Sequence, residues 1–208
     1  MPAVVAFVSQ KGGVGKSTLA RALAREGAKA GLRVKLADLD TQQGTSVDWH
    51  RTRLAAGIEP VISAEAYATA AQALAVADRY DLLILDGPAR TSAATLEIAR
   101  ASSIVVQPTG AAADDLRPAV REFHALTKAG VPKAKLVFAL NRIGTDAEEN
   151  DARQYVADAG YEALPGSLPE RAGYRMAQNA GYSITETRFA PLNERADALI
   201  QALIDRIE

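Results

Sequence analysis

The 208-residue chain contains no cysteine and only two histidines. Without cysteine it cannot use a thiolate nucleophile, an iron–sulfur cluster, a cysteine-ligated zinc ion or a disulfide framework. Two histidines argue against a multi-histidine metal site. The formal charge of −1, from 24 Lys and Arg against 25 Asp and Glu, provides no global positive field for nucleic acid, although a local basic patch remains possible.

The chain also lacks the hydrophobic segments that direct a protein to or through a membrane. Its first eight residues are largely apolar, but no basic segment precedes them and no cleavage site follows, which argues against a signal peptide. No run approaches the roughly 20 apolar residues of a membrane span. We therefore expect a cytoplasmic protein.

Short apolar runs alternate with longer helical patterns, which predicts a parallel sheet covered by helices on both faces. The chain is long enough for a substantial core, and its longest irregular stretch, residues 165–170, is too short to separate domains. We predict one three-layer α/β domain over residues 1–208. The expected strands are residues 4–8, 34–37, 61–62, 82–85, 104–106, 135–140 and 161–164, and the expected helices are residues 17–30, 45–56, 69–77, 91–101, 118–129, 147–159, 171–180 and 192–207.

A glycine-rich segment between the first strand and the first helix predicts a phosphate-binding loop, and with it the topology of P-loop NTPases. Glycines let several backbone N–H groups face one anion, and the helix N-terminus adds its positive dipole. Lys16 is placed to reach the β- and γ-phosphates, Ser17 to bind Mg²⁺ and Thr18 to lie near the α-phosphate. The predicted nucleotide-binding residues of this loop are Gly12, Gly13, Val14, Gly15, Lys16, Ser17 and Thr18.

Carboxylates follow two of the predicted strands at the sheet edge where ligands bind in open α/β folds. Asp38 and Asp40 are two residues apart at the end of one strand, so they either serve the phosphate site or cap a turn. Asp86 ends the apolar run Leu82 to Leu85 and fits a Walker B carboxylate, which holds Mg²⁺ through water.

The segment Asn141-Arg-Ile-Gly144 bears on which base is bound. A GTPase would carry an aspartate where this chain has Gly144, so guanine loses its selective partner. An amide such as that of Asn141 suits adenine, because it can pair with both the exocyclic amine and a ring nitrogen. From the residues alone, Asn141 serves equally well as a turn residue at the end of a strand.

The loop departs from the strict pattern in one informative way, because Gln10 replaces its first glycine and Lys11 follows. The run Lys11-Gly-Gly-Val-Gly-Lys16-Ser17 resembles the deviant Walker A box of the ParA/MinD family of ATPases. The resemblance covers most of the chain and is greatest to short-form ParA proteins of the ParF and VirC type, with no room for an N-terminal helix-turn-helix domain. It implies an ATP-bound homodimer in which Lys11 reaches the phosphates of the partner's nucleotide, as an arginine finger would.

The same resemblance assigns further roles. It implies that Asp40 orients or activates the attacking water, so that Lys11, Lys16 and Asp40 form the catalytic set. Asp38 would support either the shell of the Mg²⁺ ion held by Ser17 and Asp86 or the network around the lysines. Asn141 would contact the base, and the loop at residues 165–170, with Pro169, would cover the ring. ATP and Mg²⁺ are the implied cofactors.

For the whole protein, the resemblance implies slow, partner-stimulated ATP hydrolysis coupled to non-specific DNA binding, nucleoid association and a small ParB-like adaptor. Its cargo would be a plasmid, a chromosome region or a mobile element. We consider Arg171, Arg175 and Arg188 the candidate DNA-binding residues, although nearby glutamates dilute their charge. Residues 192–208 carry mixed charges and fit a core helix better than a membrane anchor. A P-loop small-molecule kinase or ligase, or a positioner of protein cargo, remains an alternative.

Overall fold

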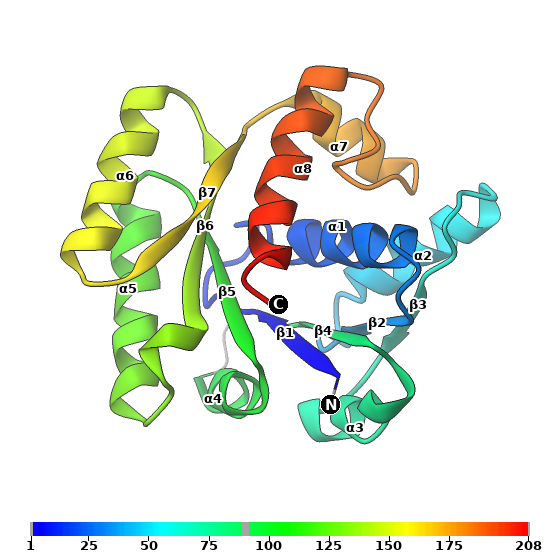
Figure 1. Ribbon diagram of the computed structural model, residues 1–208, viewed down its shortest axis with the longest axis horizontal. Coiled ribbons are helices and arrows are strands. Elements are labelled where there is room, and N and C mark those ends of the chain that lie inside the picture. The colour runs from blue at the N-terminus through cyan, green and yellow to red at the C-terminus, as the bar shows by residue number, and fades with distance from the viewer. Residues whose placement is uncertain (1, 89–91, 208) are drawn as a thin grey trace.

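The computed structural model, which describes residues 2–88 and 92–207, contains one seven-stranded sheet with helices on both faces (Figure 1). All neighbouring strands run parallel, in the order β3-β2-β4-β1-β5-β6-β7. The predicted three-layer α/β fold is therefore confirmed. The strands are β1 (Ala3–Phe7), β2 (Val34–Asp38), β3 (Ser63–Ala66), β4 (Leu82–Asp86), β5 (Ile104–Thr109), β6 (Leu136–Ile143) and β7 (Glu162–Pro169).

The helices divide between the two faces of the sheet. Alternate residues of β4 face opposite sides, so that Leu83 and Leu85 join one buried cluster while Leu82 and Ile84 join the other. The first cluster packs under α3 (Ala70–Leu74), α4 (Ser92–Ala101), α5 (Ala113–Lys128) and α6 (Asp146–Asp158), and the second under α1 (Lys16–Lys29), α2 (Thr45–Ala55), α7 (Ala172–Asn179) and α8 (Ala190–Ile204). Two 3₁₀ turns, η1 (Ala77–Arg79) and η2 (Lys133–Lys135), precede β4 and β6.

Several predicted boundaries are wrong, and two of them matter for the site. The segment predicted as a loop at residues 165–170 belongs mostly to β7, because Ser167, Leu168 and Pro169 pair with β6 beyond an irregular register. Helix α5 begins at Ala113, five residues before the predicted start at Pro118. Strand β3 lies at 63–66 rather than 61–62, and the first residue of the helix predicted at 91–101 lies outside the described residues.

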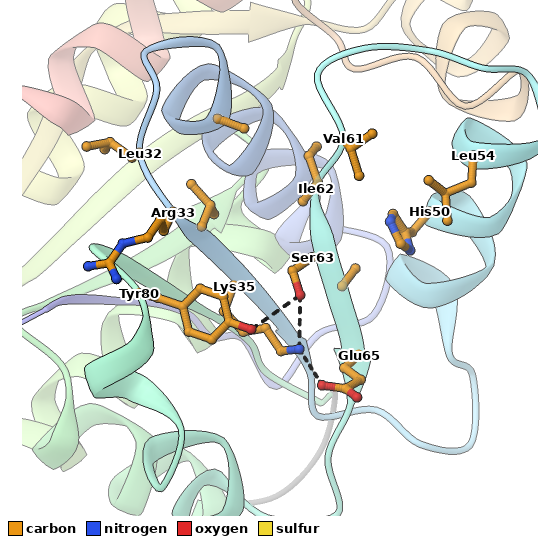
Figure 2. A pocket seen from close by; sticks show the side chains of 13 residues that line it. Leu32, Arg33, Lys35, His50, Leu54, Val61, Ile62, Ser63, Glu65 and Tyr80 are labelled. Carbon is orange, nitrogen blue, oxygen red and sulfur yellow. Dashed lines mark hydrogen bonds and ion pairs between the residues drawn. The ribbon is translucent and has the colours of Figure 1, made fainter.

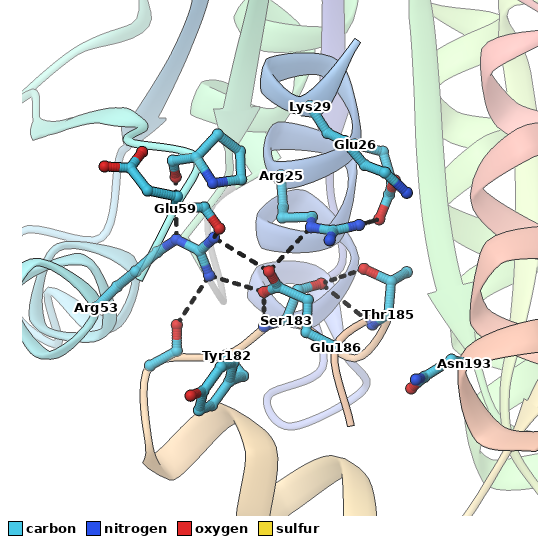
Figure 3. Close-up of polar contacts among 12 residues, drawn as sticks. Arg25, Glu26, Lys29, Arg53, Glu59, Tyr182, Ser183, Thr185, Glu186 and Asn193 are labelled. Atoms are coloured by element: carbon cyan, nitrogen blue, oxygen red, sulfur yellow. Dashed lines mark hydrogen bonds and ion pairs between the residues drawn. The ribbon is translucent and has the colours of Figure 1, made fainter. Parts of the chain in front are cut away.

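A buried ion-pair cluster joins α1 and α2 to the segment between α7 and α8 (Figure 3). The guanidinium of Arg53, on α2, is fully buried and pairs with Glu186 at 2.7 Å. It also donates to the backbone carbonyl oxygens of Glu59, Pro60 and Gly181. Arg25, on α1, contacts the same Glu186 carboxylate at 3.0 Å. These contacts provide hydrogen-bond acceptors for the buried guanidinium of Arg53 and fix the segment between α7 and α8 against α1 and α2.

Within the part of the chain that is described, no helix combines the length and the apolar character that a membrane span requires.

Candidate nucleotide site

The predicted phosphate loop connects β1 to α1 and wraps around a cavity of about 240 Å³. Gly13 (φ 74°) and Gly15 (φ 110°) adopt left-handed backbone conformations that other residues rarely take. Helix α1 begins at Lys16, so its N-terminal N–H groups lie at the loop. The residues that line the cavity are Gly12, Gly13, Gly15, Lys16, Ser17, Thr18, Arg21, Asp40, Gln43, Thr45 and Gly87.

Asn141, on β6, contacts the backbone of this loop. Its side-chain Nδ2 donates to the carbonyl oxygen of Val14 at 2.7 Å. A Cβ atom at Gly15 would lie 2.0 Å from the same Nδ2, so the loop can pack on Asn141 only if residue 15 is glycine. Val14 itself is buried and does not line the cavity. The contacts of Asn141 thus explain part of the glycine pattern, and its proposed contact with a base remains a prediction.

Lys16 is the loop's cation and is 8% exposed. Burial lowers the pKa of its amine, and the carboxylates of Asp86, Asp40 and Glu122 oppose that shift. Bound phosphates would add to this opposing effect, because negative charge favours the ammonium form. An anion bound in the cavity would therefore interact strongly with the ammonium group of Lys16.

Glu122, which sequence reasoning missed, anchors the start of the loop. Its buried carboxylate, on α5, accepts hydrogen bonds from the backbone N–H of Gln10 at 3.2 Å and from Gln107 Nε2 at 2.6 Å. Burial raises the pKa of Glu122, opposed by these donors and by Lys16. The residue lies 112 positions from Gln10 in the sequence, and no local motif marks it.

Asp86 ends β4 beside both the loop strand and β2, in register with Phe7 and with Asp38. It is 2% exposed, and burial raises its pKa to about 6, opposed by the facing hydroxyl groups of Ser17 and Ser46. Ser46 Oγ donates to Asp86 Oδ2 at 2.7 Å, whereas the buried Oδ1 accepts no hydrogen bond from the described residues. A buried carboxylate oxygen left free in this way needs a donor or a cation nearby.

These residues fit a magnesium ion held mainly by the nucleotide. Among the described residues there is no group of three or more His, Cys, Asp or Glu side chains that could bind a metal alone. Mg²⁺ at nucleotide sites keeps several waters and takes few protein ligands besides phosphate oxygens. Ser17, whose hydroxyl lies 3.2 Å from that of Thr45, would bind such an ion directly, and the free Oδ1 of Asp86 would accept a hydrogen bond from one of its waters.

Asp38 and Asp40 lie in different surroundings, although they are two residues apart. The buried Asp38 carboxylate accepts hydrogen bonds from the backbone N–H groups of Asp40, Ser46 and Val47, so it caps the start of α2. Asp40 is partly exposed and lines the phosphate cavity. The capping interpretation therefore applies to both residues, because Asp40 Oδ1 also accepts a hydrogen bond from the backbone N–H of Gln43 at 3.1 Å. The assistance of Asp38 to Mg²⁺ and the orientation of a water by Asp40 remain predictions.

Lys11 lies outside the cavity formed by its own loop. Its side chain is 45% exposed and pairs with Asp115 on α5. The ammonium also lies 3.4 Å from the carbonyl oxygen of Asp114. That carbonyl is free because Pro118, four residues later in the helix, has no N–H to donate to it. Helix α5 thus provides a docking place for the lysine on its own subunit.

The remaining predicted residues lie farther from the phosphate cavity. Pro169 is buried at the carboxyl end of β7, where it pairs with Ile143. Neither it nor Asn141 lines the phosphate cavity. Another cavity, of about 320 Å³, lies near the ends of β5, β6 and β7, and its lining includes Arg142 and the carboxylates of Asp115, Glu148, Asp151 and Glu170. The assignment of Pro169 to the base remains a prediction.

The three arginines predicted to bind DNA are exposed and lie around α7. Arg175 lies 3.6 Å from Glu170, and Arg171 donates to the backbone carbonyl of the same glutamate. The guanidinium of Arg188 lies 4.9 Å from the centre of the Phe189 ring. As expected, the negative charge of Glu170 offsets part of the positive charge of these arginines.

A third cavity, of about 540 Å³, lies near the start of β2 and the edge strand β3 (Figure 2). Its buried lysine, Lys35, pairs with Glu65 and donates to Ser63 Oγ at 3.1 Å. Since this lysine is only 4% exposed as well as paired, we assign the cavity no part in phosphate binding.

Comparison with known families agrees with this geometry. The sequence profile described as the CobQ/CobB/MinD/ParA nucleotide binding domain matches residues 5–184. The chain belongs to this family. It is also 30% identical over 191 residues to maintenance of carboxysome distribution protein A of Gloeobacter kilaueensis, a match that covers 90% of this chain and 86% of that protein. The predicted family resemblance is thus confirmed.

Solved structures of the family share the fold. The MinC:MinD cell division complex of Aquifex aeolicus matches with a TM-score of 0.77 at 18% identity, over 98% of this chain and 96% of that chain. MinD of Pyrococcus horikoshii, complexed with Mg-ADP, matches with a TM-score of 0.74 at 16% identity, over 98% and 96% of the two chains. At these identities the likeness shows the fold, which is the ParA/MinD ATPase fold.

Proposed function

We propose that this protein is a magnesium-dependent ATPase that dimerises when it binds ATP and uses the dimer to position a cargo. The observation that carries the proposal is the placement of Lys11. A lysine that opens a phosphate loop and yet lies outside its own phosphate cavity, half exposed, is available to the site of a second copy. A small-molecule kinase would have no need of such a residue.

The proposed chemistry follows from the residues around the loop. The backbone N–H groups and Lys16 hold the phosphates, and Asp40 orients a water for attack on the γ-phosphorus. Ser17 directly, and Asp86 through water, would hold Mg²⁺, which neutralises charge on the phosphate oxygens. Lys11 from the second copy adds a cation where charge develops on the transferring phosphoryl group. The relative complexed with Mg-ADP supports this choice of cofactor.

Hydrolysis would then dissociate the dimer, because loss of the γ-phosphate removes the anion that attracts Lys11 into the partner's site. We infer that the ATP-bound dimer binds DNA without sequence preference through Arg171, Arg175 and Arg188, and that a small adaptor stimulates turnover. The cargo is either a DNA element or a protein assembly. The relative named for carboxysome distribution gives specific support to a protein cargo.

DNA co-sedimentation with ATP, with ADP and without nucleotide tests the proposal. We expect the wild-type protein to sediment with DNA only in ATP, and Lys11→Ala to remain in the supernatant in all three conditions. The double variant Arg171→Ala with Arg175→Ala should dimerise normally but bind more weakly, with a flatter dependence on salt. Sedimentation that does not depend on the nucleotide would contradict ATP-dependent DNA binding. Unchanged DNA binding by the double variant would show that the DNA-binding surface lies elsewhere.

A further inference from the structure

One buried hydroxyl on α2 connects the carboxylate at the end of β4 to an arginine of α1. Ser46, the second residue of α2, is 0% exposed. Its hydroxyl donates to Asp86 Oδ2 at 2.7 Å and accepts from Arg21 Nε, on α1, at 3.2 Å. Its backbone N–H donates to Asp38 Oδ2 at 2.8 Å. Ser46 thus contacts both buried carboxylates at the ends of β2 and β4.

The direction of these hydrogen bonds is fixed by the chemistry of the groups. A guanidinium can only donate, and an ionised carboxylate can only accept. A serine hydroxyl has one proton, so Ser46 must accept from Arg21 and donate to Asp86. The three groups form a polarised chain in which the arginine sets the orientation of the hydroxyl and the hydroxyl sets that of the carboxylate.

Arg21 is held in turn by groups outside the site. Its Nη1 donates to Gln178 Oε1, on α7, at 3.3 Å, and its guanidinium carbon lies 5.6 Å from the centre of the Trp49 ring. Arg21 also lines the phosphate cavity. The side chain therefore connects α7 to the carboxylate that faces the magnesium position, through one serine.

We propose that Ser46 and Arg21 are positioning residues for the magnesium site. Ser46 occupies Oδ2 of Asp86 and leaves Oδ1 without a hydrogen bond from the described residues, so Oδ1 is the oxygen that would face a water bound to the magnesium ion. Without this hydrogen bond, the carboxylate can rotate and offer either oxygen. Groups that orient a metal ligand in this manner typically contribute about 10- to 100-fold to metal affinity. The inference rests on the proposed function, since it concerns the Mg²⁺ bound with the nucleotide.

The test measures magnesium dependence separately from nucleotide affinity. Binding of the fluorescent nucleotide mant-ADP is followed in EDTA and across a series of MgCl₂ concentrations, for the wild type and for Ser46→Ala. We expect equal affinity in EDTA and about a tenfold increase in the Mg²⁺ concentration needed for the half-maximal effect. Ser102→Ala is the matched control, because that hydroxyl is equally buried but donates to the backbone oxygen of Ile98.

Arg21→Met provides a second variant that keeps the apolar stem and removes the donors. It should shift the magnesium dependence in the same direction as Ser46→Ala, whatever its effect on affinity in EDTA, because Arg21 also lines the phosphate cavity. An unchanged magnesium requirement in both variants would overturn the inference. An equal loss of affinity by Ser46→Ala with and without Mg²⁺ would also overturn it, because that result indicates a merely structural role. A wild-type protein that bound mant-ADP in neither condition would instead contradict the proposed function.

Discussion

The contact between Lys11 and Asp115 predicts that removing the carboxylate makes the ATP-dependent dimer tighter. In the single subunit the lysine is paired with its own α5, and we propose that it leaves this contact to reach the partner's phosphates. Each subunit must then break one ion pair when the dimer forms. In Asp115→Asn that opposing interaction is weakened before dimerisation begins.

The magnitude follows from the exposure of the pair. Because 45% of the Lys11 side chain is exposed, solvent screens the interaction, and it contributes about 0.5–1 kcal/mol. Two pairs are broken in each dimer, which gives about 1–2 kcal/mol and a dissociation constant lowered about 5- to 30-fold. This change in the dissociation constant is expected only with ATP bound, because without a γ-phosphate Lys11 has no anion to bind in the partner's site.

Sedimentation equilibrium in a non-hydrolysable ATP analogue measures this constant. Asp114→Asn is the matched control, because it removes the same charge from the neighbouring residue, whose contact with Lys11 is made by its backbone carbonyl. We expect the control to resemble the wild type. A dimer of Asp115→Asn that was as weak as the wild-type dimer, or weaker, would refute the reasoning.

Three further variants test the site and the fold. Lys16→Ala should abolish nucleotide binding in a titration with mant-ATP, and retained affinity would contradict the role of the phosphate loop. Asp40→Ala should bind ATP and dimerise without releasing phosphate, so an unchanged turnover rate would count against its role. Arg53→Met should lower the free energy of unfolding by about 3 kcal/mol in urea, because it leaves buried acceptors without their donor; a loss below 1 kcal/mol would show that Arg25 alone can hold Glu186.

Local patterns were enough to predict the glycine-rich loop between β1 and α1 and the strand that ends at Asp86. The loop's glycines, Lys16 and Ser17 are contiguous, and Asp86 follows an apolar run whose length matches β4. The sheet followed from the alternation of strands and helices. These features depend on neighbouring residues, so one sequence is sufficient to recognise them.

Contacts between distant segments could not be predicted in the same way. Glu122 and Asp115 meet the loop from α5, more than a hundred residues away, and Ser46 meets Asp86 across 40 positions. The early start of α5 was missed because proline usually marks a first turn, whereas here Lys11 takes the place of the missing donor. The first part of β7 was predicted as a strand at residues 161–164, whereas residues 165–169 were predicted as a loop; in this second part the pairing with β6 is irregular near Gly166.

The central claim is that each copy supplies Lys11 to its neighbour's site, and mixing two inactive variants tests it most directly. Lys11→Ala keeps Asp40 but has no lysine to give, and Asp40→Ala can give the lysine but cannot hydrolyse. If Lys11 acts across the dimer, a mixed dimer contains one complete site, so phosphate release should return when the two proteins are combined. If the mixture stays as inactive as either variant alone, although mixed dimers form, the lysine acts within its own subunit and the account is wrong.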